Sequence, residues 1–215
     1  MIKFFIKGFR VNALLTILSR ITGFIRDIVL AFFLGAGIVS DIFFISSKLP
    51  NLFRRITAEG AMTSSFLPIY SKLKIQNGEV FAFIYFKNVL YRVVIYLFIL
   101  MLIFQITMPF VIHFLAPGFM DNDNVIKQIT SLSRITIIFM PLISIVAILG
   151  VATNVSGKFW VLAFTPTILN TSIIIGCFFI NDYWTIKSLP LAIATVFGGL
   201  IQIIFILTMI IIRLL

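Results

Sequence analysis

The segment from Asn12 to Leu34 reads NALLTILSRITGFIRDIVLAFFL. It is long enough to cross a bilayer, because a spanning helix needs about 20 mostly apolar residues. It nevertheless carries Arg20, Arg26 and Asp27. Placing a charge near the centre of a spanning helix costs about 2.5–3.5 kcal/mol on insertion scales. We therefore expect these side chains to face protein or water and not lipid.

A helical projection of this segment separates two faces. The polar face is about 120° wide at about 100° per residue and consists of Asn12, Thr16, Ser19, Arg20, Gly23, Arg26 and Asp27. The opposite, lipid-facing side consists of Leu14, Ile17, Leu18, Ile21, Ile25, Ile28 and Val29. Two alternatives stay open: an amphipathic helix that lies flat on the membrane, and charges that reach out to the lipid headgroups.

The composition extends this interpretation to the whole chain. Of the 215 residues, 61% are hydrophobic and only 11% are charged, and the mean hydropathy is +1.17. Soluble domains are about 25% charged, so the sequence predicts an all-α polytopic membrane protein. The net charge of +10 is scattered among the apolar segments, which argues against nucleic acid and favours membrane lipids or an anionic substrate as partners.

We predict one lobe of six transmembrane helices. They are placed at about residues 12–34, 40–57, 82–115, 125–153, 160–180 and 189–212, and the first is interpreted as a retained span and not as a cleaved signal peptide. Pro50 is expected to kink or break the second helix. Residues 58–78 are too polar to span and predict a loop with a surface helix. Basic residues gather in the loops on one side, which predicts that both termini lie in the cytoplasm.

The second helix continues the charged pattern. Asp41, Lys48 and Arg55 are seven residues apart, so they drift by only about 20° per step, and Glu59 extends the row if the helix continues past Pro50. Other interpretations are a helix cap for Asp41, extension to the headgroups for Lys48, and ordinary interface positions for Arg54, Arg55 and Glu59.

Cations outnumber acids in these two helices. The cations are Arg20, Arg26, Lys48, Arg54 and Arg55, and the acids are Asp27, Asp41 and Glu59. Guanidinium groups suit phosphate because they present paired donors in a plane and keep their charge. An anionic, phosphate-bearing ligand is therefore expected; salt bridges within the protein are the alternative for the acids.

The sequence contains no enzyme signature that we recognise. It has no metal-ligand spacing, no phosphate-binding glycine loop and no nucleophile elbow. We therefore expect no catalytic residue, no metal and no cofactor. Cys177 is the only cysteine, so an internal disulfide is excluded.

Several motifs resemble the MurJ (MviN) lipid II flippases of bacteria. They are SRxxGFIRD from Ser19 to Asp27, LGAG from Leu34 to Gly37, DIFF from Asp41 to Phe44, and KLPNLFRRITAEGA from Lys48 to Ala61. Shorter similarities are FLPI from Phe66, APGF from Ala116 and FTPTILN from Phe164 to Asn170.

The resemblance implies a function as well as a fold. Members of this family belong to the multidrug/oligosaccharidyl-lipid/polysaccharide exporter superfamily. They move an undecaprenyl-diphosphate-linked peptidoglycan precursor across the cytoplasmic (inner) membrane, and they have two six-helix lobes around a cationic cavity. It implies that Arg20, Arg26 and Arg54 contact the headgroup, with Lys48, Arg55 and Glu59 in the same cavity and Asp41 near the outer gate. Ser19, Gly23, Asp27, Pro50 and Asn51 are assigned to gating or helix packing.

The length differs from the family pattern, because the chain stops after the sixth predicted helix. We expect the first lobe alone, either as a truncated or split product or as the partner of a separately encoded second lobe, and we expect that it does not flip lipid by itself. A homodimer that stands in for the two lobes is a further alternative. A cation-coupled multidrug exporter, a membrane enzyme acting on polyprenyl phosphates, and a lipid-binding remnant without transport remain as alternatives.

Overall fold

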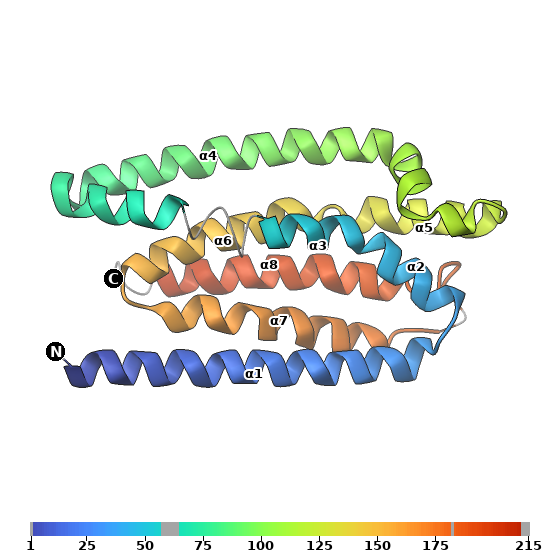
Figure 1. Cartoon of the computed structure of the whole chain (residues 1–215), viewed down its shortest axis with the longest axis horizontal. Helices are drawn as coiled ribbons and strands as arrows, with labels where there is room; N and C mark the ends of the chain where they lie inside the picture. The colour runs from blue at the N-terminus through green and yellow to red at the C-terminus, as the bar shows by residue number, and fades with distance from the viewer. Residues whose placement is uncertain (1, 57–64, 182, 212–215) are drawn as a thin grey trace.

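The protein is a bundle of α-helices, shown in Figure 1. The computed structural model describes residues 2–56, 65–181 and 183–211, and it assigns no β-strand to these residues. Among these described residues, four helical stretches are long and apolar enough to cross a membrane: Leu67–Leu115, Asp123–Val155, Phe159–Cys177 and Leu189–Ile211. The predicted class, an all-α polytopic membrane protein, is confirmed.

Helix α1 (Ile2–Leu34) forms one side of the bundle. It packs along α7 (Phe159–Cys177), which packs against α8 (Leu189–Ile211), and α8 packs against α6 (Phe139–Val155). Six of the seven side chains predicted to face lipid are exposed on α1. The seventh, Val29, packs against the hydrophobic core instead, because it lies at the edge of the apolar face and close to α7.

The predicted second helix is broken in two. Helix α2 (Ile38–Ser46) ends just before Ser47, and α3 (Lys48–Arg54) follows it. Pro50 explains the position of the break, because it has no N–H to donate to the carbonyl of Ser46, four residues earlier. That carbonyl instead accepts a hydrogen bond from the Thr136 hydroxyl at 2.6 Å.

The predicted fourth helix is broken in the same way. Helix α5 (Asp123–Thr136) and α6 are separated by two residues, and Pro141 follows the gap. The Ile137 carbonyl, four residues before Pro141, accepts from the Met140 amide at 3.0 Å. Because α2 packs on α5 and α3 packs on α6, the two breaks lie side by side.

Replacing Thr136 by Val should test this pairing of the breaks. The substitution keeps the shape but leaves the buried Ser46 carbonyl without its donor, which should lower the free energy of unfolding by about 1–2 kcal/mol. In a Pro50→Ala background the restored amide can serve that carbonyl, so the same substitution should cost much less. Reversible unfolding in detergent measures both, with Thr130→Val as control, since the Thr130 hydroxyl bonds only within its own helix. Equal costs in the two backgrounds would contradict the explanation.

Helix α4 (Leu67–Leu115) reverses its direction at Gly78, whose φ of 86° a glycine tolerates best. Its first part is the surface helix predicted within residues 58–78, and in Figure 1 it folds back beside the longer second part. A 3-10 turn (Pro117–Phe119) then leads to α5. The Asn122 side chain caps α5 by accepting from the Val125 amide at 3.2 Å.

Candidate functional site

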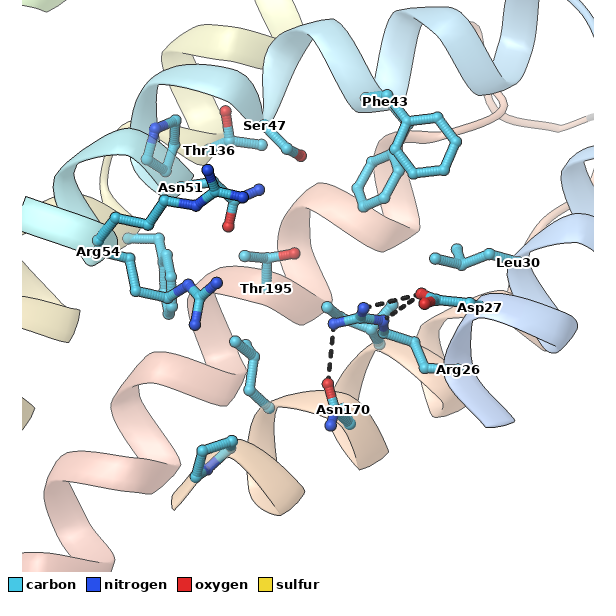
Figure 2. A pocket seen from close by; sticks show the side chains of 17 residues that line it. Arg26, Asp27, Leu30, Phe43, Ser47, Asn51, Arg54, Thr136, Asn170 and Thr195 are labelled. Atoms are coloured by element: carbon cyan, nitrogen blue, oxygen red, sulfur yellow. Dashed lines mark hydrogen bonds and ion pairs between the residues drawn. The ribbon is translucent and has the colours of Figure 1, made fainter. Parts of the chain in front are cut away.

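A polar cavity of about 260 Å³ lies between α1, α3, α7 and α8, beside both helix breaks. Figure 2 shows the side chains that surround it. The residues that line it are Arg26, Asp27, Leu30, Phe43, Phe44, Ser47, Pro50, Asn51, Arg54, Arg55, Thr136, Phe139, Pro166, Leu169, Asn170, Ile173 and Thr195. Three arginines and one aspartate give this cavity an excess of positive charge.

Arg26 is held in place on the α1 wall by two neighbours. Its Nε and Nη2 atoms donate to Asp27 Oδ1 at 3.0 and 2.8 Å, and its Nη1 atom donates to Asn170 Oδ1 at 2.8 Å. A guanidinium group has five N–H donors, so these three bonds leave two donors for a ligand. The Arg26 side chain is 29% exposed, which leaves it accessible from the cavity.

Asn170 joins α7 to α1 at this point. Its side-chain amide donates to the Ser19 carbonyl and to the Thr22 hydroxyl, both at 3.2 Å. A Cβ at Gly23 would lie 3.4 Å from Asn170 Nδ2, so the glycine keeps the contact close. Asn170 is only 5% exposed, and both polar atoms of its side chain bond to α1. It therefore fixes the position of the Arg26 guanidinium.

The opposite wall comes from α3 and from the breaks. Figure 2 shows Arg54 and Asn51 directed at the same hollow as Arg26, with Thr195 of α8 between the two sides. Ser47 and Thr136 complete this wall. The cavity thus has guanidinium groups on two facing walls and hydroxyl and amide groups between them.

Three other residues that were predicted to contact the ligand do not line this cavity. Arg20 is exposed on α1 and does not line the cavity; it lies six residues before Arg26, which is about 9 Å along the helix axis. Asp41 is exposed in the first turn of α2 and does not cap it; the Ser40 hydroxyl bonds to the Gly37 backbone instead. The Lys48 amine donates to the Leu115 carbonyl at 3.3 Å, at the end of α4.

The predicted charged row does not form a continuous line, because the break at Ser47 turns the helix between Asp41 and Arg55. Arg55 lines the cavity. Glu59 lies outside the described residues. Of the residues assigned to gating or packing, Pro50, Asn51 and Asp27 line the cavity. Ser19 and Gly23 lie next to the Asn170 side chain, which bonds to the Ser19 carbonyl.

Four polar residues that line the cavity were not predicted as site residues: Ser47 at the helix break, and three buried residues of other helices. Asn170, Thr136 and Thr195 come from α7, α5 and α8, and each is buried. A projection of a single helix cannot show which residues of another helix face it. The FTPTILN motif was the available signal for Asn170, and Thr136 and Thr195 lie in no such motif.

The sequence of this chain is similar to that of known proteins. The family model "Lipid II flippase MurJ" matches residues 30–214. The chain is 34% identical over 193 residues to a probable lipid II flippase MurJ of Rickettsia prowazekii, and 32% identical over 193 residues to one of Buchnera aphidicola from Acyrthosiphon pisum. Each alignment covers 90% of this chain and 38% of the relative. The chain thus spans little more than a third of the length of these relatives.

The fold agrees with this similarity. A solved structure described as lipid II flippase MurJ in an inward closed conformation superposes with a TM-score of 0.73 at 26% identity, over 92% of this chain and 42% of that one. The matched family model covers most of the chain, and two relatives exceed 30% identity over nine-tenths of it. This chain therefore belongs to the MurJ family of lipid II flippases.

Proposed function

We propose that this chain forms the part of a lipid II flippase that receives the diphosphate headgroup of a polyprenyl-linked peptidoglycan precursor. The cavity carries the proposal, because Arg26 on α1 and Arg54 on α3 approach one polar hollow from facing walls. Phosphate oxygens accept from guanidinium donors with matching geometry and with opposite charge. The isoprenoid tail stays in the bilayer, where the outward face of α1 is apolar.

The arrangement around Arg26 suits reversible binding. Asp27 and Asn170 hold the guanidinium before a ligand arrives, so little side-chain entropy is lost on binding. Asp27 also offsets part of the guanidinium charge, because its Oδ1 atom lies 2.8 Å from Arg26 Nη2. A site that must release its ligand on the other side of a membrane needs this moderate affinity.

Transport requires a second body. Alternating access proceeds by the rocking of one bundle against another around a fixed site, and several lining residues, such as Phe44 and Arg55, are exposed at the open side of the cavity. We propose that a second lobe covers this side in the working transporter. We place the assembly in the bacterial cytoplasmic membrane with both chain ends on the cytoplasmic side, which the distribution of basic loop residues supports.

A multidrug exporter is the second candidate in the same superfamily. Cationic drugs need acidic side chains in the cavity, whereas here Asp27 is the one acid among the lining residues that the structure describes, and Arg26 already pairs with it. The cavity therefore favours an anionic substrate.

Growth of bacteria depleted of their own flippase tests the proposal. The 215-residue chain alone should not restore growth, whereas a chimaera that joins it to the remaining part of the Rickettsia prowazekii relative should restore it. A membrane-inserted chimaera that never supports growth would contradict lipid flipping. Growth with the chain alone would contradict the need for a second lobe.

A further inference from the structure

A second cavity lies at the end of the bundle where both termini are found (Figure 1). Its volume is about 460 Å³, larger than that of the arginine cavity, and the two share no lining residue. We propose that it binds one membrane phospholipid with an anionic headgroup, which is separate from the transported lipid.

The walls of this cavity are mainly apolar and suit an acyl chain. The apolar side chains come from α4, α6 and α8 and are Val80, Phe83, Phe86, Ala152, Met209 and Ile210; Tyr70, Glu79, Thr153, Ser156 and Lys158 complete the lining. Phe86 is buried and packs against the rings of Phe66 and Tyr70 at 6.1 and 5.6 Å between centroids. Val80 is 76% exposed and Phe83 is 52% exposed. The cavity thus opens on the outer side of the bundle, where lipid surrounds a membrane protein.

A lysine lies at the polar end of the cavity. The Lys158 amine donates to the Met209 carbonyl at 3.1 Å, and an ammonium group has three N–H donors, so two remain for a ligand. Among the described residues no carboxylate lies within ion-pair distance of Lys158; Glu79, on the same cavity, bonds to Lys74 at 2.8 Å. The ammonium is therefore available for an anionic group.

The backbone fixes this lysine in place. At the end of α6 the Gly157 amide donates to the Asn154 carbonyl at 2.9 Å, and the Lys158 amide donates to the Thr153 carbonyl at 2.9 Å. Gly157 has a φ of 76°. These features form a Schellman motif, which ends a helix in a defined turn. Lys158 is thus set beside the cavity by the helix end and not by a flexible loop.

An amphiphile satisfies both ends of the cavity. A free anion would leave the apolar walls unfilled, and an uncharged lipid would leave the ammonium without a counter-charge. Basic loop residues mark this end as the proposed cytoplasmic side, where anionic lipids concentrate. The occupant that fits is therefore a phospholipid of that leaflet, with its phosphate at Lys158 and one chain against Phe83 and Phe86.

Lipid binding to the purified chain in a zwitterionic detergent tests the proposal. We expect phosphatidylglycerol to be retained about fivefold more tightly than phosphatidylcholine with the same acyl chains, by native mass spectrometry. Lys158→Gln should remove this preference. Lys72→Gln is the matched control, because Lys72 is an exposed lysine at the same end but outside the cavity, and it should keep the preference.

Two further measurements separate this site from others. Ala152→Phe fills the apolar part of the cavity and should weaken the binding of both lipids. Circular dichroism should show unchanged helicity in this variant. If the variant does not fold, competition by glycerol phosphate tests the apolar contact in its place. Glycerol phosphate should not compete at concentrations that match the lipid. Equal loss in Lys158→Gln and Lys72→Gln, effective competition by glycerol phosphate, or displacement by an undecaprenyl-diphosphate lipid would each overturn the proposal.

Discussion

Arg26→Ala is expected to abolish growth support by the chimaeric flippase while leaving its membrane insertion intact. The two donors of Arg26 that remain for a ligand are lost together with the charge. Two charge-assisted hydrogen bonds to phosphate correspond to a loss of about 100-fold in affinity for a diphosphate lipid. Growth of depleted cells and binding of an undecaprenyl-diphosphate lipid to the purified protein measure the two effects.

Two variants control for this result. Arg26→Lys keeps the charge but not the planar fork, so it should retain part of the affinity. Arg92→Ala removes an exposed arginine of α4 that does not line the cavity, and it should behave as the unmodified protein. Normal growth with Arg26→Ala would remove this residue from the site.

Asn170→Asp is expected to have the second largest effect. The new carboxylate would face Arg26 Nη1 across the present 2.8 Å contact, so the guanidinium would pair with acids on two sides. Affinity for the diphosphate lipid should fall by at least about tenfold, because the charge of the α1 wall is neutralised. The carboxylate keeps the bond to Arg26 but cannot donate to the Ser19 carbonyl as the Asn170 amide does, so binding is compared in protein whose helicity by circular dichroism is unchanged.

Asn170→Leu should act mainly on the stability of the fold and less on the affinity for the lipid. It leaves the Arg26 Nη1 donor without its present acceptor and removes the link to Ser19 and Thr22, so the free energy of unfolding should fall by about 1–3 kcal/mol. Thr171→Val is the control, because the Thr171 hydroxyl bonds only to the Thr167 carbonyl of its own helix. If Asn170→Asp bound the lipid normally, Asn170 would not set the charge of the cavity.

The sequence predicted those parts of the fold that depend on local pattern. Apolar length predicted an all-α membrane protein, and the helical projection of α1 predicted which apolar side chains face outward, with Val29 as the exception. Arg20, which the projection placed on the inward face, is exposed. Pro50 predicted a break. Its position at Ser47 follows from the lost bond to the Ser46 carbonyl, which sequence reasoning can derive from the proline alone.

The site was predicted only in part, because it depends on contacts between distant segments. Arg26 and Arg54 were identified by their charge and by family resemblance, and both line the cavity. Asn170 is 144 residues from Arg26 in sequence, and no periodicity reveals that contact. Lys48 was selected by its seven-residue spacing from Asp41. That spacing puts two residues on one face only in an unbroken helix, and this helix breaks at Ser47.

Thiol labelling at the cavity tests the central claim that the arginines face a water-accessible, cationic chamber. In the protein with Asn51→Cys, which places the thiol on the α3 wall, an anionic methanethiosulfonate should react about tenfold faster than a cationic one of the same size. The native Cys177 is fully buried and gives no background, and Phe197→Cys, exposed on the outside of α8, should react slowly with both reagents. Equal rates at Asn51→Cys, or slow rates like those at Phe197→Cys, would contradict the account.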